Sequence, residues 1–141
     1  MDESSHEVEI DPEDLKVFRE MKAEIITLAV ERSLLREEEI RHHGKNARQI
    51  IAEGFDFTFK MLDAAMAVGE LSILEDQLSW ALKRLPHDNV NPVFILNRFE
   101  LFYDVVDEVM PAEKSTGVKH YIRWMIERMH ELLPNTDQPP K

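Results

Sequence analysis

The positions of glycine and proline constrain the fold of this chain more than any other feature. Between Asp11 and Leu133, these residues stand where a helix is expected to begin or end: Gly44, Gly69, Pro86, Pro92, Pro111 and Gly117. Gly54 is the exception, because it falls inside a predicted helix. The segments between them carry apolar residues at three- and four-residue steps, the period of an amphipathic helix. The sequence therefore predicts an all-α fold, a compact bundle of five to six amphipathic helices.

The length of the chain bounds its domain organisation. Its 141 residues suffice for one hydrophobic core without disulfides or a metal. We expect a single helical-bundle domain over 11–133, preceded by a disordered acidic segment over 1–10 and followed by a flexible polar tail over 134–141. No apolar run is long enough to span a bilayer, and the N-terminus is acidic, unlike a signal peptide. A cytoplasmic location without membrane contact is the expectation.

The charge of the chain restricts its partners. A formal net charge of −11 opposes binding to nucleic acid and to anionic membranes, since both are polyanions. One alternative stays open, because a small acidic helical protein can mimic nucleic acid and inhibit the protein that binds it. The simpler interpretation is that the acidity maintains solubility.

The N-terminal helix is expected to begin with Asp11 as its N-cap, followed by Pro12 in the first turn. Its apolar face recurs at three-, four- and seven-residue steps: Leu15, Phe18, Met21, Ile25, Leu28 and Leu35. Whether this helix continues through His43 is left open by the sequence. A break near Ser33 would divide it, with Ser33 capping the second piece.

The next helix should run from an N-cap at Asn46 to about Val68, where Gly69 ends it. Its apolar arc is wide enough to predict a central helix packed on two sides, and Gly54 would permit a close helix crossing. The remaining helices are predicted over 71–85, over 92–109, and from Ser115 or Thr116 to about 132.

Two Glu-x-x-His pairs have the spacing with which helix bundles hold two iron ions: Glu39/His42 and Glu127/His130. Such ligands must face the core. At 100° per residue, Glu127 lies about 200° and His130 about 140° from the core-facing Met125. The other pair lies in a charged stretch. Surface charge is therefore the favoured interpretation of both pairs, and no metal site is expected.

The sequence offers no catalytic centre. It has no cysteine, no nucleophile motif and no histidine at a core-facing position suited to ligate haem. We therefore expect a protein that is not an enzyme and has no cofactor.

The two tryptophans are more informative. Trp80 and Ile73 lie opposite the leucine seam of their helix, and Trp124 and His120 lie opposite the seam of theirs. A tryptophan away from the main seam forms either a second packing layer or a recognition surface. These four residues are the candidate interaction surface for a protein partner, with a second copy of the chain in a homodimer as one possibility.

Three stretches carry a family resemblance: Leu62-Asp-Ala-Ala-Met-Ala-Val-Gly-Glu70, Val90-Asn-Pro-Val-Phe-Ile-Leu96 and Val109-Met-Pro111. With the helices between them, they resemble the N-terminal helical sensor domains of bacterial stressosome-type signalling regulators. The resemblance covers about two thirds of the chain. Those domains are globin-like and haem-free, and no catalytic or ligand residue carries over from them. They usually precede an output domain, whereas this chain ends shortly after Leu133. A weaker likeness is to the small helical bundle that precedes cobalamin-binding domains, although the corrinoid-binding motif is missing.

The resemblance and the lack of a catalytic pattern together suggest a non-enzymatic regulatory or sensor-like protein-interaction module of a bacterial signalling system. One alternative is a helical bundle that binds a small apolar, tetrapyrrole or corrinoid-type ligand without a histidine ligand, among Phe55, Phe59, Phe99 and Phe102. The other is the acidic inhibitor that mimics nucleic acid.

Overall fold

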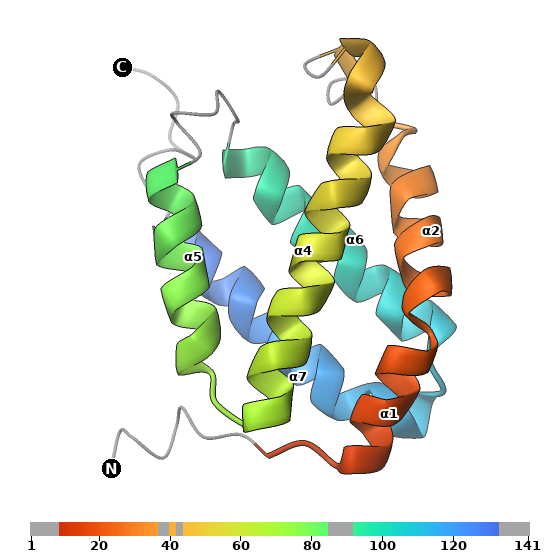
Figure 1. Ribbon diagram of the computed structural model, residues 1–141, viewed down its shortest axis with the longest axis vertical. Helices are drawn as coiled ribbons and strands as arrows, with labels where there is room; N and C mark the ends of the chain where they lie inside the picture. Colours follow the sequence, from red (N-terminus) through yellow and green to blue (C-terminus); the bar gives the residue numbers. More distant parts are fainter. Residues whose placement is uncertain (1–8, 37–39, 42–43, 85–91, 133–141) are drawn as a thin grey trace.

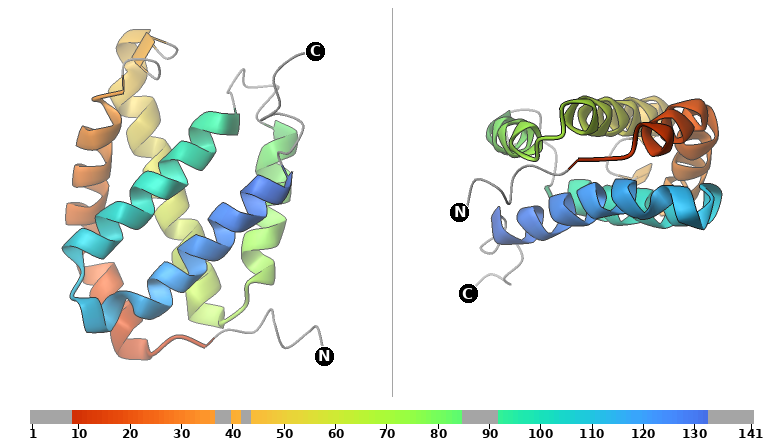
Figure 2. Two further views of the ribbon diagram at one scale, coloured as in Figure 1. Left: turned by 180° about the vertical axis from the view of Figure 1, so that it is seen from behind. Right: turned by 90° about the horizontal axis from the view of Figure 1, so that it is seen from below.

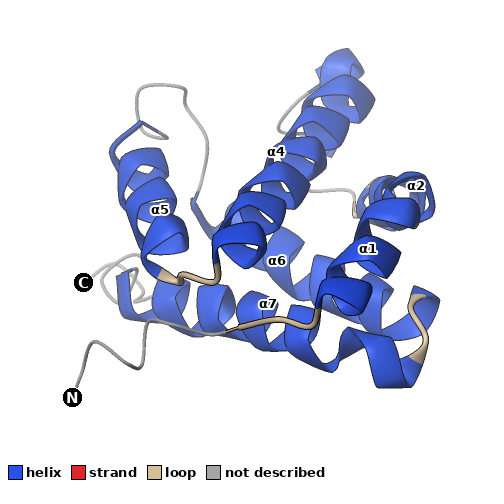
Figure 3. Ribbon diagram, turned by 60° about the horizontal axis from the view of Figure 1, so that its bottom comes forward, coloured by secondary structure: helices blue, strands red, loops and turns tan. Residues whose placement is uncertain are grey.

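The computed structural model describes residues 9–36, 40–41, 44–84 and 92–132. Within these residues the chain forms six α-helices and one short 3-10 helix, joined by turns and without a β-strand, as Figure 3 shows. The α-helices are α1 (Pro12–Glu20), α2 (Lys22–Ser33), α4 (Ala47–Val68), α5 (Ser72–Arg84), α6 (Pro92–Val109) and α7 (Ala112–Leu132), and the 3-10 helix is η2 (Gly44–Asn46). The predicted all-α bundle is confirmed.

The helices pack in two layers. In Figure 1, α4 runs through the middle of the bundle, with α5 on one side and α1 and α2 on the other. The view from below in Figure 2 shows α1, α4 and α5 in one layer and α6 and α7 in the other. Helix α2 packs against both α4 and α6 and so joins the layers at one edge. None of the described helices combines the length and apolarity needed to cross a bilayer.

The N-terminal segment forms two helices. The predicted cap is present, because the Asp11 carboxylate accepts a hydrogen bond from the backbone N–H of Glu13 at 2.9 Å. A first break occurs at Met21, which the sequence did not predict, and a second follows Ser33, where a break was considered. Leu35 was predicted to lie on the apolar face but is 81% exposed, since the helical phase ends with α2. His42 and His43 lie outside the described residues.

The central position predicted for the second long helix is confirmed. Helix α4 spans the predicted range, ends at Gly69 in a left-handed conformation, and contacts α1, α2, α5, α6 and α7. Asn46 precedes α4, but its side chain makes no capping hydrogen bond there. A cluster of phenylalanines fills the core on one side of α4. Phe18 stacks on Phe59 with ring centroids 4.1 Å apart, and Phe55 stacks on Phe102 at 6.2 Å.

The start of the last helix was predicted wrongly. Helix α7 begins at Ala112, directly after Pro111, and not at Ser115 or Thr116. Ser115 is instead a buried residue of the first turn, whose hydroxyl donates to the carbonyl of Ala112 at 3.2 Å.

Gly117 was predicted to mark a helix boundary, and this too is wrong, since it lies inside α7. Its role is to make room for a neighbour. A Cβ at this position would stand 3.1 Å from Cγ1 of Ile10, which is closer than carbon atoms ordinarily pack. Ile10 was assigned to the N-terminal segment, yet it packs against the core. The packed part of the chain thus includes this residue.

Candidate binding cleft

A mostly apolar cleft lies among α4, α5 and α6, with one residue from α7. Its volume is about 410 Å³, within the range of small-molecule binding sites. The residues that line it are Ile50, Glu53, Gly54, Phe57, Thr58, Met61, Gln77, Leu78, Trp80, Ala81, Leu82, Arg84, Ile95, Arg98, Phe99 and Met129. The cleft is thus built from segments that are far apart in the sequence.

Helix α5 forms one wall of the cleft and is fixed to the bundle in two ways. Its seam residues Leu74 and Leu78 are buried, as the leucine spacing predicted. The guanidinium of Arg128 on α7 also forms a bidentate salt bridge with Glu75 on α5. Nε lies 2.8 Å from Oε1 and Nη2 lies 2.7 Å from Oε2. The hydrogen bonds that Arg128 donates to this carboxylate raise the pKa of the guanidinium above its ordinary value. The paired charges hold α5 in register with α7.

Arg98 brings a positive charge into the apolar interior between α4 and α6. Only 5% of the residue is exposed, and the chain comes close to α4 at Gly54. A Cβ at Gly54 would stand 2.9 Å from Nη1 of Arg98, so any larger residue would displace the guanidinium. Gly54 lies inside a helix, as predicted. The close approach that it permits is that of a side chain, whereas the sequence predicted a crossing of helix backbones.

Three aromatic residues line the cleft, one from each of the three helices. Trp80 of α5 is 54% exposed, and the guanidinium of Arg84 lies over its ring, 5.6 Å from the centroid. Phe57 of α4 is 43% exposed. Phe99 of α6 is buried. Two aromatic surfaces of the cleft are therefore accessible to a binding partner.

The candidate interaction surface predicted from the sequence is divided in the structure. Trp80 lines the cleft. Trp124 and Ile73 are partly buried and pack against the core, so they belong to the second packing layer that was the alternative interpretation. His120 is exposed on α7, with its ring edge-on to Tyr121 at 6.4 Å. Among these four described residues, Trp80 is the one at the cleft.

Sequence reasoning did not find the Gly54–Arg98 pair or the exposure of Phe57. A signal existed for the pair, because Arg98 is the one charged residue in the mainly apolar stretch from Pro92 to Phe99. The close approach of this arginine to Gly54, a residue of another helix, could not be inferred from the sequence.

The Glu-x-x-His pairs were interpreted as surface charge. Glu127 and His130 are both exposed, and Nε2 of His130 lies 3.9 Å from a carboxylate oxygen of Glu100. The other pair, Glu39 and His42, falls outside the described residues. Within the residues that the structure places, no group of three or more His, Cys, Asp or Glu side chains is arranged to hold a metal ion.

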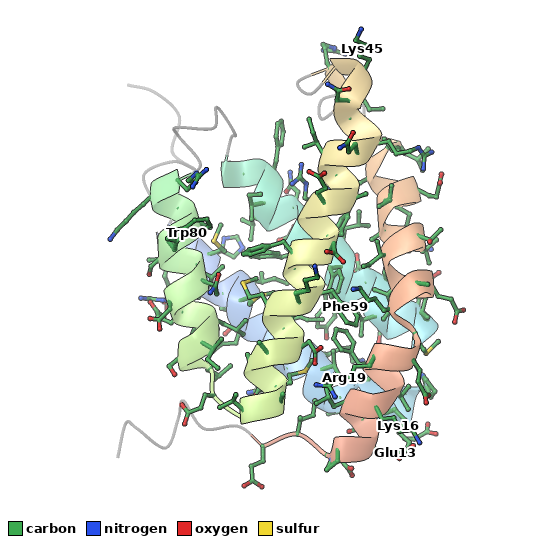
Figure 4. The ribbon with its side chains drawn as sticks, in the orientation of Figure 1. Glu13, Lys16, Arg19, Lys45, Phe59 and Trp80 are labelled. Carbon is green, nitrogen blue, oxygen red and sulfur yellow. The ribbon has the colours of Figure 1, made fainter. Side chains whose placement is uncertain are left out.

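The predicted ligand position among four phenylalanines is wrong for three of them. Phe55, Phe59 and Phe102 are buried in the aromatic core cluster and pack against one another or against Phe18. Phe99 alone of the four lines the cleft. Figure 4 shows Phe59 between α4 and the α1–α2 side of the bundle, whereas Trp80 lies on α5, on the other side of α4. The phenylalanine cluster is core, and the cleft is a separate feature.

Comparison with known proteins adds no assignment. No protein-family model matches the chain, and no curated protein matches its sequence. The geometry of the cleft is therefore the basis for a functional proposal.

Proposed function

We propose that this chain is a cytoplasmic, non-enzymatic regulatory module of the sensor type, and that the cleft is its recognition site. The observation that supports this function is an apolar cleft lined by a tryptophan that is more than half exposed. Large apolar side chains left in water mark interaction sites when they adjoin a cleft. A sensor role also agrees with the resemblance to the helical input domains of bacterial signalling regulators.

The chemistry of the lining favours binding over catalysis. Its titratable residues are one glutamate and two arginines, and its single hydroxyl belongs to Thr58. That hydroxyl donates to the backbone carbonyl of Gly54 at 3.0 Å, which ties it to the helix. The carboxylate of Glu53 accepts a hydrogen bond from the side chain of Gln49 at 3.1 Å. The described lining therefore lacks a nucleophile paired with a general base, the arrangement on which covalent catalysis depends.

The contact point for a protein partner is Trp80 together with Arg84. These two residue types dominate the binding energy of protein interfaces, and here the guanidinium lies over the indole ring. Such stacking restricts both side chains before a partner binds, which lowers the entropy lost on association. A second copy of the chain is the first partner to test, because it requires no other component.

The test is the assembly state of purified protein, measured by light scattering and native mass spectrometry over a range of concentrations. We expect a dimer that Trp80→Ala weakens by about tenfold or more, the loss typical of a central interface tryptophan. Leu35→Ala is the matched control, since Leu35 is also exposed but does not line the cleft. A monomer at all concentrations, or a dimer that Trp80→Ala leaves unchanged, would contradict self-association through this surface.

A small-molecule ligand is the second candidate for this cleft. The volume of the cleft supports this candidate. The ligand would lie in the cleft, and not among the core phenylalanines where the sequence placed it.

A further inference from the structure

The buried polar groups around the cleft are already occupied. The hydroxyl of Thr58 donates to the carbonyl of Gly54, and the buried Arg98 has an interaction partner within the protein. In the part of the chain that the structure describes, no buried side-chain nitrogen or oxygen lacks a hydrogen-bond partner. A ligand that buried a charged or strongly polar group here would therefore leave that group unpaired, at a large cost in desolvation.

The other two titratable residues of the lining, Glu53 and Arg84, are exposed to solvent and carry charges of opposite sign. The carboxylate of Glu53 accepts a hydrogen bond from Gln49 on the same helix, and the guanidinium of Arg84 lies over the ring of Trp80. Water and salt screen exposed charges, so neither residue attracts an ion strongly. The lining thus favours neither an anion nor a cation, and its chemistry fits a neutral molecule.

The apolar walls of the cleft favour aromatic rings. Phe57, Trp80 and Phe99 come from α4, α5 and α6, and aromatic side chains bind other rings through offset-stacked and edge-to-face contacts. Met61 of α4 and Met129 of α7 are buried members of the same lining. The sulfur of a methionine makes favourable contacts with aromatic rings and adapts to their shape. All four helices therefore contribute side chains that suit an aromatic ligand.

The volume of the cleft indicates the size of that ligand. An apolar cavity of about 150 Å³ holds one benzene ring, and the cleft, at about 410 Å³, is roughly two to three times as large. We propose that the cleft binds a neutral molecule of two or three aromatic rings. This inference rests on the proposed function in one respect, because it takes the cleft as the recognition site. It adds the chemical class of the molecule that the cleft recognises.

The test compares two fluorescent probes that share one skeleton. N-phenyl-1-naphthylamine is neutral and has three aromatic rings, and 8-anilinonaphthalene-1-sulfonate has the same rings with one sulfonate added. Both probes become brighter in apolar surroundings, so each is titrated against the protein at pH 7. We expect the neutral probe to bind at a single site and about tenfold or more tightly than the sulfonate, because burial of an unpaired charge opposes binding.

Three variants locate the site. Ala81→Phe places a ring inside the cleft and should abolish binding of the neutral probe. Ala67→Phe is the matched control, since Ala67 is exposed on α4 and does not line the cleft, and it should leave binding unchanged. Phe57→Leu keeps an apolar side chain but removes a ring, so it should weaken binding by about 2- to 12-fold, the range for one aromatic pair.

Circular dichroism checks that each variant is folded. If Ala81→Phe does not fold, Phe57→Leu decides the outcome, because Phe57 is 43% exposed and its replacement leaves the core intact. Equal or tighter binding of the sulfonate would overturn the proposal, and so would the absence of saturable binding by the neutral probe. Binding that persists unchanged in both Ala81→Phe and Phe57→Leu would also overturn it, since the probe would then bind elsewhere.

The two experiments on this cleft are independent of each other. The assembly measurement on Trp80→Ala uses no fluorescent probe, and the fluorescence titration requires no protein partner. A failure of this inference is therefore distinguishable from a failure of the proposed function.

Discussion

Replacing Gly117 by alanine tests whether the segment before α1 is packed as the structure shows. In an ordinary helix interior, Gly→Ala stabilises by about 1 kcal/mol because the glycine loses more backbone entropy on folding. At Gly117 the new Cβ would meet Cγ1 of Ile10 at 3.1 Å and its Cδ1 at 3.4 Å. Ile10 must then move by a few tenths of an ångström and lose part of its contact with α7.

The magnitude follows from the burial of Ile10. Full burial of an isoleucine contributes about 1.5–3 kcal/mol, and Ile10 is only partly buried, so Ile10→Ala should cost about 1 kcal/mol. In the unchanged protein, Gly117→Ala should stabilise the helix and weaken the packing of Ile10 by similar amounts. Its net effect on the free energy of unfolding should therefore be close to zero. In the Ile10→Ala background the closest remaining atom is the Cβ at position 10, which is 4.0 Å away, an ordinary contact. There Gly117→Ala should stabilise by the full amount of about 1 kcal/mol.

The assay is a double-mutant cycle, with free energies of unfolding from urea titrations followed by circular dichroism. We expect a coupling of about 1 kcal/mol between the two substitutions. If Gly117→Ala stabilises equally in both backgrounds, Ile10 does not lie on α7 and the interpretation of Gly117 as a packing glycine is refuted. If it destabilises equally in both, the glycine is required for a reason other than Ile10.

Three further predictions follow from the core and its ion pairs. Phe102→Ala should cost about 3–5 kcal/mol in urea unfolding and more than Phe99→Ala, because Phe102 is enclosed by other rings whereas Phe99 borders the cleft. Burial raises the pKa of Tyr121 from 10.0 to about 12, so the unfolded chain loses this proton first as the pH rises. Its contribution to stability should be complete below pH 10 and fall by about 1.4 kcal/mol per pH unit from there to about pH 12, a decline that Tyr121→Phe removes. Glu75→Gln should lower the free energy of unfolding by about 1 kcal/mol, because it weakens the salt bridge to Arg128. High salt should reduce this difference in stability between the variant and the unchanged protein.

The sequence by itself determined the helices and the buried face of most of them. The bounds of α4 follow from Gly69 and from apolar spacing, and the first turn of α6 follows from Pro92. These signals are local, because a helix repeats every 3.6 residues and a chain breaker acts on its own turn. Where a helix has both a clear apolar period and a residue that ends it, its bounds can be predicted from the sequence alone.

The candidate site depended on contacts that no local pattern contains. The sequence singled out Trp80 because a tryptophan off the seam is unusual, but it could not separate Trp80 from Trp124. The packing of whole helices against one another decides which of the two tryptophans remains exposed to solvent. The same holds for Arg98, whose place in the interior depends on a glycine of another helix.

The glycines show most clearly which features are local and which depend on tertiary contacts. Gly69 ends a helix through its own left-handed backbone conformation, which only the nearest residues need to allow. Gly54 and Gly117 lie inside helices and make room for Arg98 and Ile10, residues distant in the sequence. Glycine thus serves two physical purposes. The first is conformational freedom of the backbone, which is a local property. The second is the absence of a side chain, which matters only where a residue distant in the sequence packs against the glycine. The sequence identified the first purpose and anticipated the second at Gly54, but only the tertiary structure specifies which atoms occupy the vacant space.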